Sequence, residues 1–240
     1  MGMTLPVILL IFQLIPSFLV SSPDPASRWN LLYPKIRDGL AAPEEAQKEM
    51  GQLEILLKGE YARAENRRGE GRFHFPLRGY TPHSIGGKRG DGYKPGGYDF
   101  FDGNRHKGHP GHDIFIHDQN QDGLDDRTGL SVEVLSVSSG IVVSVNTDWR
   151  PGSPIRGGNY VWVFEPIRGR YAYYAHLNHI FVQVGQTVSA GERLGTVGRT
   201  GLNAYPKRSP THLHFSVFHS VDGYPKPFDP YPDLIRAVHQ

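Results

Sequence analysis

The chain has no cysteine among its 240 residues. A disulfide framework is therefore excluded, and the protein would fold in the same way in a reducing or an oxidising compartment. The absence also excludes a lipoprotein anchor, because no thiol follows the apolar segment at the N-terminus. An excess of charge of one sign is lacking as well. The formal net charge is +2 and the basic residues form no cluster, so nothing indicates a nucleic-acid partner.

The N-terminus has no Lys or Arg ahead of its apolar run, which covers residues 5–20. Residues 1–22 nevertheless have the pattern of a signal peptide, with Ser21 and Ser22 behind the run. The sequence therefore predicts an exported protein, periplasmic or extracellular. Pro23 disfavours cleavage at this point, and the run is close to the lower limit of about 17 residues for spanning a bilayer. An uncleaved membrane anchor stays open as the alternative.

A helix is predicted from Pro43, because Pro and the acidic Glu44 and Glu45 suit the first turn of a helix. Apolar side chains then recur every three or four residues, which is the spacing of one helix face: Met50, Leu53, Leu57, Tyr61 and Ala64. We expect the helix to end near the basic stretch at residues 67–71 and to pack on the domain that follows. The alternative is a pro-segment that covers a cleft until it is removed.

Short runs of β-branched and aromatic residues follow, divided by Gly, Pro and Asn, and they are typical of antiparallel β-sheet. The clearest runs lie at residues 132–134, 140–145, 160–164 and 170–174. The predicted fold is therefore mainly β, an antiparallel sheet with an open groove and an N-terminal helical extension. We divide the chain into a signal peptide, the helical extension, a main domain and a C-terminal tail, at residues 1–22, 23–71, 72–222 and 223–240.

Two histidines separated by one residue, His212 and His214, form the most informative pattern in the chain. Side chains alternate across a β-strand, so both imidazoles would point to one face while Leu213 turns into the core. One strand can thereby present two nitrogens to a metal ion or to the water that the ion binds.

A histidine and a carboxylate four residues apart, His109 and Asp113, form a second candidate group in a stretch too rich in Gly and Pro for a helix. Imidazole and carboxylate are ordinary zinc ligands. Three protein ligands leave a fourth tetrahedral position open for water, as in catalytic zinc sites. The chain has 12 histidines, so either pair taken alone is open to explanation as a chance spacing.

Further motifs connect the two pairs in a fixed order. They are Phe-Pro-Leu-Arg-Gly at 75–79, His-x-Gly-x-Asp at 109–113, Tyr-x-His at 174–176, two glycine-turn segments at 182–188 and 191–201, and His-x-His at 212–214. This order resembles that of the lysostaphin-type (LytM-like) zinc metalloendopeptidases over residues 75–218. The resemblance implies that residues 72–222 form a zinc metalloendopeptidase domain.

The resemblance also implies which residues bind zinc. In the family these are the His and Asp of His-x-Gly-x-Asp and the second His of His-x-His, which correspond here to His109, Asp113 and His214. His106 and His112 lie close by, but only the register at His109 places a glycine at the family's glycine position. We therefore expect His106 and His112 to be polar loop residues.

Two further histidines, His176 and His212, correspond to the family's residues that flank the zinc-bound water. Zinc lowers the pKa of such a water towards about 7 and polarises a carbonyl, so a peptide bond can be attacked at neutral pH. The two imidazoles would then transfer protons or hold the oxyanion, and the sequence does not assign which does which. Without the other motifs, His176 would be taken for a packing residue among its neighbouring tyrosines.

A loop after the second candidate group resembles a calcium-binding loop. Its oxygen donors are Asp118, Asn120 and Asp122, followed by Gly123 at the turn. The bidentate Glu expected at position 12 is replaced by Gly129, and no helix–loop–helix surrounds the loop. We predict a calcium site there in addition to zinc, with a solvated acidic turn as the alternative.

Two long segments are expected to shape the cleft. Residues 80–108 are crowded with Gly and form an irregular loop. Its aromatic side chains either line a substrate groove or pin the loop to the domain: Tyr93, Tyr98, Phe100 and Phe101. Residues 203–211 are longer than expected from the family and carry Lys207 and Arg208, which would change the substrate preference.

The sequence thus predicts an exported zinc-dependent endopeptidase that hydrolyses peptide bonds in peptidoglycan stem or cross-bridge peptides through a metal-activated water. One alternative is a non-catalytic wall-binding module that activates another cell-wall hydrolase, as degenerate relatives do. Another is a secreted, calcium-stabilised interaction protein. The complete set of five His and Asp residues favours the enzyme, because a binding module has no chemical need for it.

Overall fold

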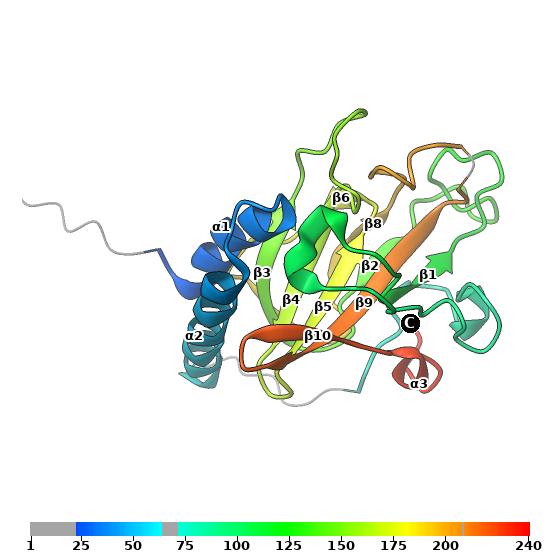
Figure 1. Ribbon diagram of the computed structural model, residues 1–240. Coiled ribbons are helices and arrows are strands. Elements are labelled where there is room, and N and C mark those ends of the chain that lie inside the picture. The colour runs from blue at the N-terminus through cyan, green and yellow to red at the C-terminus, as the bar shows by residue number, and fades with distance from the viewer. Residues whose placement is uncertain (1–22, 64–71, 208) are drawn as a thin grey trace, which may run out of the picture.

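The computed structural model describes residues 23–63, 72–207 and 209–240. The predicted signal peptide at 1–22, the expected end of the helix at 67–71 and Arg208 lie outside these residues. The described part is an antiparallel β-sheet with two helices packed at one side (Figure 1). Within it, no helix combines the length and the apolar composition needed to cross a membrane.

The main sheet has seven strands, and every neighbouring pair in it is antiparallel. In spatial order they are β1 (Gly111–Phe115), β9 (His212–Val221), β5 (Arg170–Ala175), β4 (Tyr160–Glu165), β3 (Gly140–Asn146) and β7 (Thr187–Val188), with β10 (Tyr224–Phe228) also paired to β9. A second sheet contains β2 (Glu133–Leu135), β8 (Arg193–Val197) and β6 (Leu177–Ile180). The predicted mainly β, antiparallel fold is confirmed.

Strand β9, which pairs with β1, β5 and β10, has one face in the core and the other at the site. Leu213 and Phe215 are completely buried and belong to a cluster that also contains residues of the second sheet, such as Val134 and Leu194. The alternation of a strand places His212 and His214 on the opposite face. The core thereby holds the strand that carries the two histidines.

Two helices precede the sheet, α1 (Pro25–Arg37) and α2 (Pro43–Arg63). The predicted start of α2 at Pro43 is confirmed. Its apolar face is buried as expected at Met50, Leu53, Leu57 and Tyr61, while Ala64 lies outside the described residues.

Helix α1 was not predicted from the sequence. The Asp24 carboxylate accepts a hydrogen bond from Ser27 N at 3.0 Å, and Pro25 occupies the first turn, so the helix has an ordinary N-terminal signal. Its Trp29 is 1% exposed and packs against rings of β4 and β5, at 5.7 Å from Trp162 and 5.4 Å from Tyr171 between centroids. The helix therefore covers one face of the main sheet (Figure 1).

The C-terminal residues also pack on the domain. Besides β10, they form the short helix α3 (Tyr231–Leu234), and Phe75 N donates to Val238 O at 2.8 Å. Two 3-10 turns, η1 (Pro82–Ser84) and η2 (Phe100–Arg105), lie in the glycine-rich segment before β1. The division of the chain at residue 222 stays a prediction, but residues 223–240 are no detached tail.

Candidate active site

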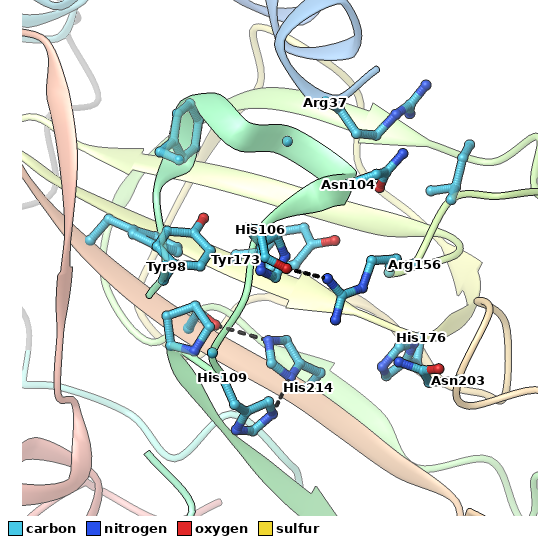
Figure 2. A pocket seen from close by; sticks show the side chains of 18 of the residues that line it. Arg37, Tyr98, Asn104, His106, His109, Arg156, Tyr173, His176, Asn203 and His214 are labelled. Carbon is cyan, nitrogen blue, oxygen red and sulfur yellow. Dashed lines mark hydrogen bonds between the residues drawn. The ribbon is translucent and has the colours of Figure 1, made fainter. Parts of the chain in front are cut away.

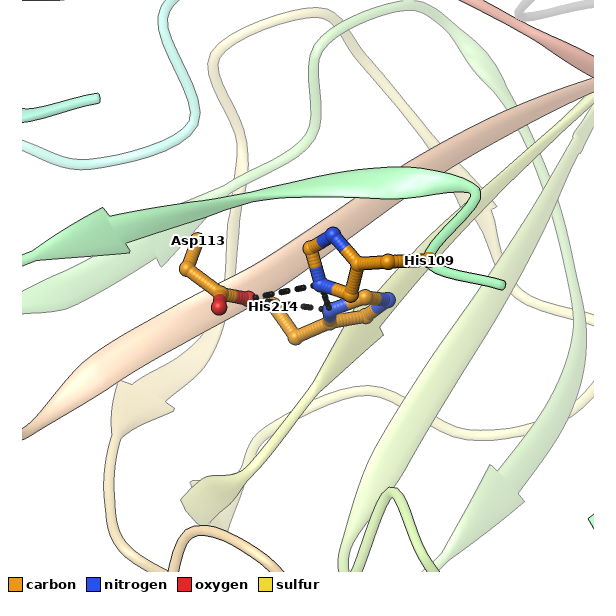
Figure 3. A group of neighbouring side chains, drawn as sticks. All are labelled: His109, Asp113 and His214. Atoms are coloured by element: carbon orange, nitrogen blue, oxygen red, sulfur yellow. Dashed lines mark hydrogen bonds and ion pairs between the residues drawn. The ribbon is translucent and has the colours of Figure 1, made fainter. Parts of the chain in front are cut away.

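Three side chains from the ends of two paired strands meet at one point (Figure 3). Asp113 of β1 stands opposite His214 of β9 in the strand register, and His109 lies just before β1. Asp113 Oδ1 lies 3.0 Å from His214 Nδ1 and 3.2 Å from His109 Nε2, and the two nitrogens are 3.1 Å apart. The structure thus brings together the three predicted zinc ligands, in the His/Asp cluster of the described residues best suited to a metal ion.

The other nitrogen of each of these rings has its own partner. His109 Nδ1 lies 2.8 Å from Gly92 O, and because a carbonyl only accepts, this nitrogen carries the proton and Nε2 keeps its lone pair. His214 Nε2 lies 3.0 Å from Ser216 Oγ, which can accept a hydrogen bond from Nε2–H and leave the Nδ1 lone pair free. Such outer contacts are the usual means of orienting histidine ligands.

The resulting donor set fits zinc. Two imidazole nitrogens and one carboxylate oxygen converge on one point. Their separations of 3.0 to 3.2 Å are close to the value of about 3.3 Å for ligands at tetrahedral corners about 2.0 Å from zinc. Burial alone would raise the pKa of Asp113, but the adjacent His109 and His214 rings hold it far below its usual range, so the group is a carboxylate.

The glycine of the His-x-Gly-x-Asp motif has a steric reason. A Cβ at Gly111 would lie 2.3 Å from Ser216 Oγ and 2.5 Å from Phe215 O on the neighbouring strand. A larger residue would therefore push β1 away from β9 and separate Asp113 from His214. The motif selects glycine because the two ligand-bearing strands must approach closely here.

The two predicted catalytic histidines lie beside this group. The ring of His176 is 4.9 Å from that of His212 and 5.9 Å from that of His214, between centroids. His176 Nδ1 donates to Thr200 O at 2.8 Å, and His212 Nδ1 donates to Pro210 O at 2.7 Å. Each ring therefore presents an Nε2 lone pair, and that of His212 lies 3.7 Å from Asp113 Oδ1.

His176 is held in an unusual backbone conformation between β5 and β6. Its φ angle is 66°, in the left-handed region that few residues other than glycine adopt. Gly201 packs against it so closely that a Cβ there would lie 2.8 Å from His176 Nδ1. Burial, followed by the nearby His212 and His214, lowers the pKa of His176 well below its usual value, so this imidazole is neutral at neutral pH.

A cleft extends from the metal group along the face of the sheet (Figure 2). Its walls come from the segment before β1, from the loop between β3 and β4, and from the end of α1, which contributes Tyr33 and Arg37. A second hollow shares His109 and Asp113 with this cleft and is otherwise lined by Gly86, Gly87, Gly92, Lys94 and Phe115. Two of the three candidate ligands, His109 and Asp113, therefore border both hollows.

The wall formed by α1 and the cleft residue Arg156 were not predicted from the sequence. Tyr33 and Arg37 carry no motif, and only the capping signal at Asp24 indicated the helix that brings them to the cleft. Arg156 lies in a loop rich in Gly and Pro without a spacing pattern.

The aromatic residues of segment 80–108 divide between the two predicted roles. Tyr98 and Phe100 line the cleft, and both also pack on Phe218 of β9. Phe101 packs against Tyr224, and Tyr93 stacks on His112.

The neighbouring histidines His106 and His112 differ from each other. His112 is fully buried and bonds to Asp229 at 2.9 Å, so the expectation of a polar loop residue is wrong for it. His106 lines the cleft, and burial lowers its pKa to about 4. In the segment of residues 203–211, Asn203 and Ser209 line the cleft, whereas Lys207 does not.

The calcium prediction for Asp118, Asn120 and Asp122 is not supported. The Asp118 carboxylate is 6% exposed and accepts hydrogen bonds from Asp122 N at 3.0 Å, from Gly123 N at 2.8 Å and from the Thr211 hydroxyl. Asn120 Oδ1 accepts from Asp122 N at 3.0 Å. These oxygens are turned towards N–H and O–H donors of the protein, so the loop is closed by its own hydrogen bonds.

Comparisons with known proteins agree with this site. Peptidase family M23 matches residues 119–230, which include His176, His212 and His214. Lysostaphin from Staphylococcus staphylolyticus is 32% identical over 115 residues, which is 48% of this chain and 22% of lysostaphin, and lysostaphin from Staphylococcus simulans is 31% identical over the same length. The match thus spans about a fifth of the length of these curated relatives.

Solved structures of similar proteins include three peptidases. The lysostaphin catalytic domain from Staphylococcus simulans has a TM-score of 0.40 and 26% identity, covering 64% of this chain and 94% of that domain. LytM from Ruminococcus gnavus has a TM-score of 0.47 and 22% identity, covering 90% and 83%. A zinc-containing peptidase from Vibrio cholerae has a TM-score of 0.43 and 24% identity, covering 71% and 41%.

The family match and the two lysostaphin relatives agree with the order of motifs in the sequence, which ends in the His-x-His strand of this site. Residues 119–230 therefore match peptidase family M23, and the chain is similar to the lysostaphin-type (LytM-like) peptidases.

Proposed function

We propose that this protein is a zinc-dependent endopeptidase that hydrolyses peptide bonds in peptidoglycan. One observation carries the proposal: His109 Nε2, Asp113 Oδ1 and His214 Nδ1 converge on one point, with separations of 3.0 to 3.2 Å. Zinc, when bound by these residues, would supply an acidified water and a Lewis acid for the peptide carbonyl.

His176 and His212 are the side chains that transfer protons in this proposal. The Nδ1–H group of each is held by a main-chain carbonyl, so Nε2 is the atom that accepts and returns a proton. A protonated imidazole at the same position would also donate a hydrogen bond to the oxyanion that forms from the peptide carbonyl. The two roles stay unassigned between the two histidines, because both rings have the same tautomer and flank the same group.

The form of the groove supports cleavage within a chain. Asp113 borders both the hollow lined by Gly86, Gly87 and Gly92 and the cleft that contains His176 and His212. An extended peptide can therefore continue past the reacting bond in both directions. Such a groove suits an endopeptidase better than an enzyme that trims chain ends.

A wall-binding module without activity is the alternative. Both unligated histidines, His176 and His212, have their Nδ1 atoms tied to carbonyls and their Nε2 atoms free. A binding module has no need for two imidazoles held in this way beside a metal group. The arrangement therefore favours the enzyme.

The test is mass spectrometry of muropeptides released from purified peptidoglycan by the zinc-loaded protein, with His109→Ala as the control. New peptide ends that require His109 would support the endopeptidase and would name the bond that is cut. Bound zinc without products from several wall types would overturn the activity and favour the binding module. Export of the protein through residues 1–22 is part of the proposal, because the substrate lies outside the cytoplasm.

A further inference from the structure

The half-buried arginines differ in how their charge is neutralised. In residues 23–63, 72–207 and 209–240 there are five of them: Arg28, Arg37, Arg156, Arg170 and Arg199. Three form ion pairs with carboxylates, namely Arg28 with Glu49, Arg37 with Asp38 and Arg170 with Asp233. Arg156 and Arg199 have no carboxylate partner among the described residues, and of these two only Arg156 lines the cleft.

The Arg156 side chain is positioned by its surroundings. Its Nη1 donates to His106 O at 2.9 Å, which ties the β3–β4 loop to the segment before β1. The next residue is pressed against β5, since a Cβ at Gly157 would lie 1.9 Å from the Tyr173 hydroxyl. Figure 2 shows the guanidinium group extending from its loop towards the side of the cleft where His109 and His214 lie.

The cleft offers this guanidinium no counter-charge. Among the described residues that line it, Asp113 is the only one with a carboxylate, and that group belongs to the metal cluster. The second arginine in the lining, Arg37, is already bonded to both oxygens of Asp38, at 2.8 and 2.7 Å. Arg156 lines the cleft and, among the described residues, uses one of its five N–H groups on a carbonyl.

A carboxylate is the ligand that this arrangement lacks. Guanidinium and carboxylate groups form two parallel charge-assisted hydrogen bonds, which is a geometry that a lysine or an amide cannot reproduce. The positive charge of a half-buried arginine without a free carboxylate beside it is not neutralised until an anion binds. The peptide itself is the natural source of that anion.

We propose that Arg156 binds a carboxylate of the peptide substrate and thereby selects acidic stem peptides over amidated or oligoglycine peptides. This inference rests on the proposed endopeptidase function and names the chemical class of its substrate. Arg156 is then a specificity-determining residue, outside the zinc ligands and the proton-transferring histidines.

The probes are a cross-linked dimer of stem peptides with free carboxylates and the same dimer with those carboxylates amidated. For the zinc-loaded full chain we expect kcat/KM for the free-acid dimer to be about 10- to 100-fold higher than for the amidated one, the range for hydrogen bonds between charged groups. Arg156→Gln should lower kcat/KM for the free-acid dimer and bring the ratio between the two dimers close to one. Arg156→Lys, which keeps the charge but not the fork, should retain part of it.

Arg150→Gln is the matched control, because Arg150 lies in the same loop outside the cleft lining and bonds to Trp149 O at 2.7 Å. It should leave the preference unchanged. Thermal unfolding of each variant checks that the loss of the Arg156 contact with His106 has not disturbed the fold.

Calorimetric binding of both dimers to the metal-free protein separates this inference from the proposed function. Equal cleavage of the two dimers by the wild type would overturn the role of Arg156 and leave the endopeptidase standing. Binding that prefers the free acid and depends on Arg156, without any cleavage, would support the carboxylate site and overturn the enzymatic activity. If neither cleavage nor a binding preference is observed, both the endopeptidase activity and the role of Arg156 are overturned.

Discussion

Ser216 Oγ lies 3.0 Å from His214 Nε2, two residues along the same strand and on the same face. The hydroxyl is fully buried, so it has no water to replace the imidazole as a partner. This contact fixes the ring of His214 with Nδ1 towards Asp113. A residue without any metal-ligand motif thus orients one of the three candidate zinc ligands.

Ser216→Ala should weaken zinc binding about 10- to 100-fold, which is the usual effect of losing an outer partner of a metal ligand. Competition with a chromogenic chelator would measure the zinc affinity. Ser144→Ala is a suitable control, because Ser144 is also fully buried in the main sheet but bonds to Asn30 of α1. Unchanged zinc affinity in Ser216→Ala would show that the ring is held by other means.

His176→Ala and His212→Ala should each lower kcat by about 10²- to 10⁴-fold while the protein keeps one zinc ion. Neither ring is among the three groups that converge on the metal position, so the loss should fall on proton transfer. Peptide cleavage and metal content are measured on the same samples. Loss of zinc from either variant would contradict this division of roles.

Trp29→Ala should destabilise the whole domain by about 3 to 5 kcal/mol. The side chain is 1% exposed and donates from its ring nitrogen to the Tyr171 hydroxyl at 3.3 Å, so its removal leaves a cavity against the sheet. Chemical denaturation measures the effect, and Leu31→Ala serves as the control because Leu31 is 59% exposed on the same helix.

The packing of helix α1 argues against the alternative that the N-terminal extension is a removable pro-segment. Helix α1 forms a wall of the cleft through Tyr33 and Arg37, and its buried face is part of the core. Removal of residues 23–63 should therefore unfold the protein rather than activate it. A stable, more active product after limited proteolysis would support the pro-segment instead.

The stability of the protein should also depend on pH through Glu54. Burial raises the pKa of this carboxyl above its usual value, although the hydroxyls of Ser220 and Tyr171 donate to it. Below the unfolded pKa of about 4.5 both states are protonated and the stability contribution is fully present. Between the unfolded and the folded pKa the carboxyl is ionised in the unfolded state and protonated in the folded state. This difference favours unfolding, so the stability contribution of Glu54 is lost as pH rises through the folded pKa.

Glu54→Gln cannot titrate, so the free energy of unfolding of the variant relative to the wild type should increase from pH 4 to pH 7. Urea denaturation at both pH values measures it, and Glu44→Gln on the exposed start of the same helix should show no such trend. A constant difference between variant and wild type across this range would mean that Glu54 has the same pKa in both states.

The sequence by itself determined the elements whose chemistry is local or periodic. The His-x-His pattern is meaningful because side chains alternate on a strand, so His212 and His214 share a face wherever the strand lies. The start of α2 followed from Pro43 and the apolar spacing behind it. The antiparallel runs at residues 140–145, 160–164 and 170–174 became β3, β4 and β5.

Only the tertiary structure decided the walls of the cleft and the state of the acidic loop. Arg156 and Tyr33 are far apart in the chain, and no spacing rule relates them before the β3–β4 loop and α1 are folded onto one sheet face. Asp118 has the spacing of a calcium ligand, but its carboxylate accepts a hydrogen bond from Thr211, 93 positions away. Spacing along a chain selects the groups that can meet a ligand, whereas long-range packing decides which of them are already bonded to the protein.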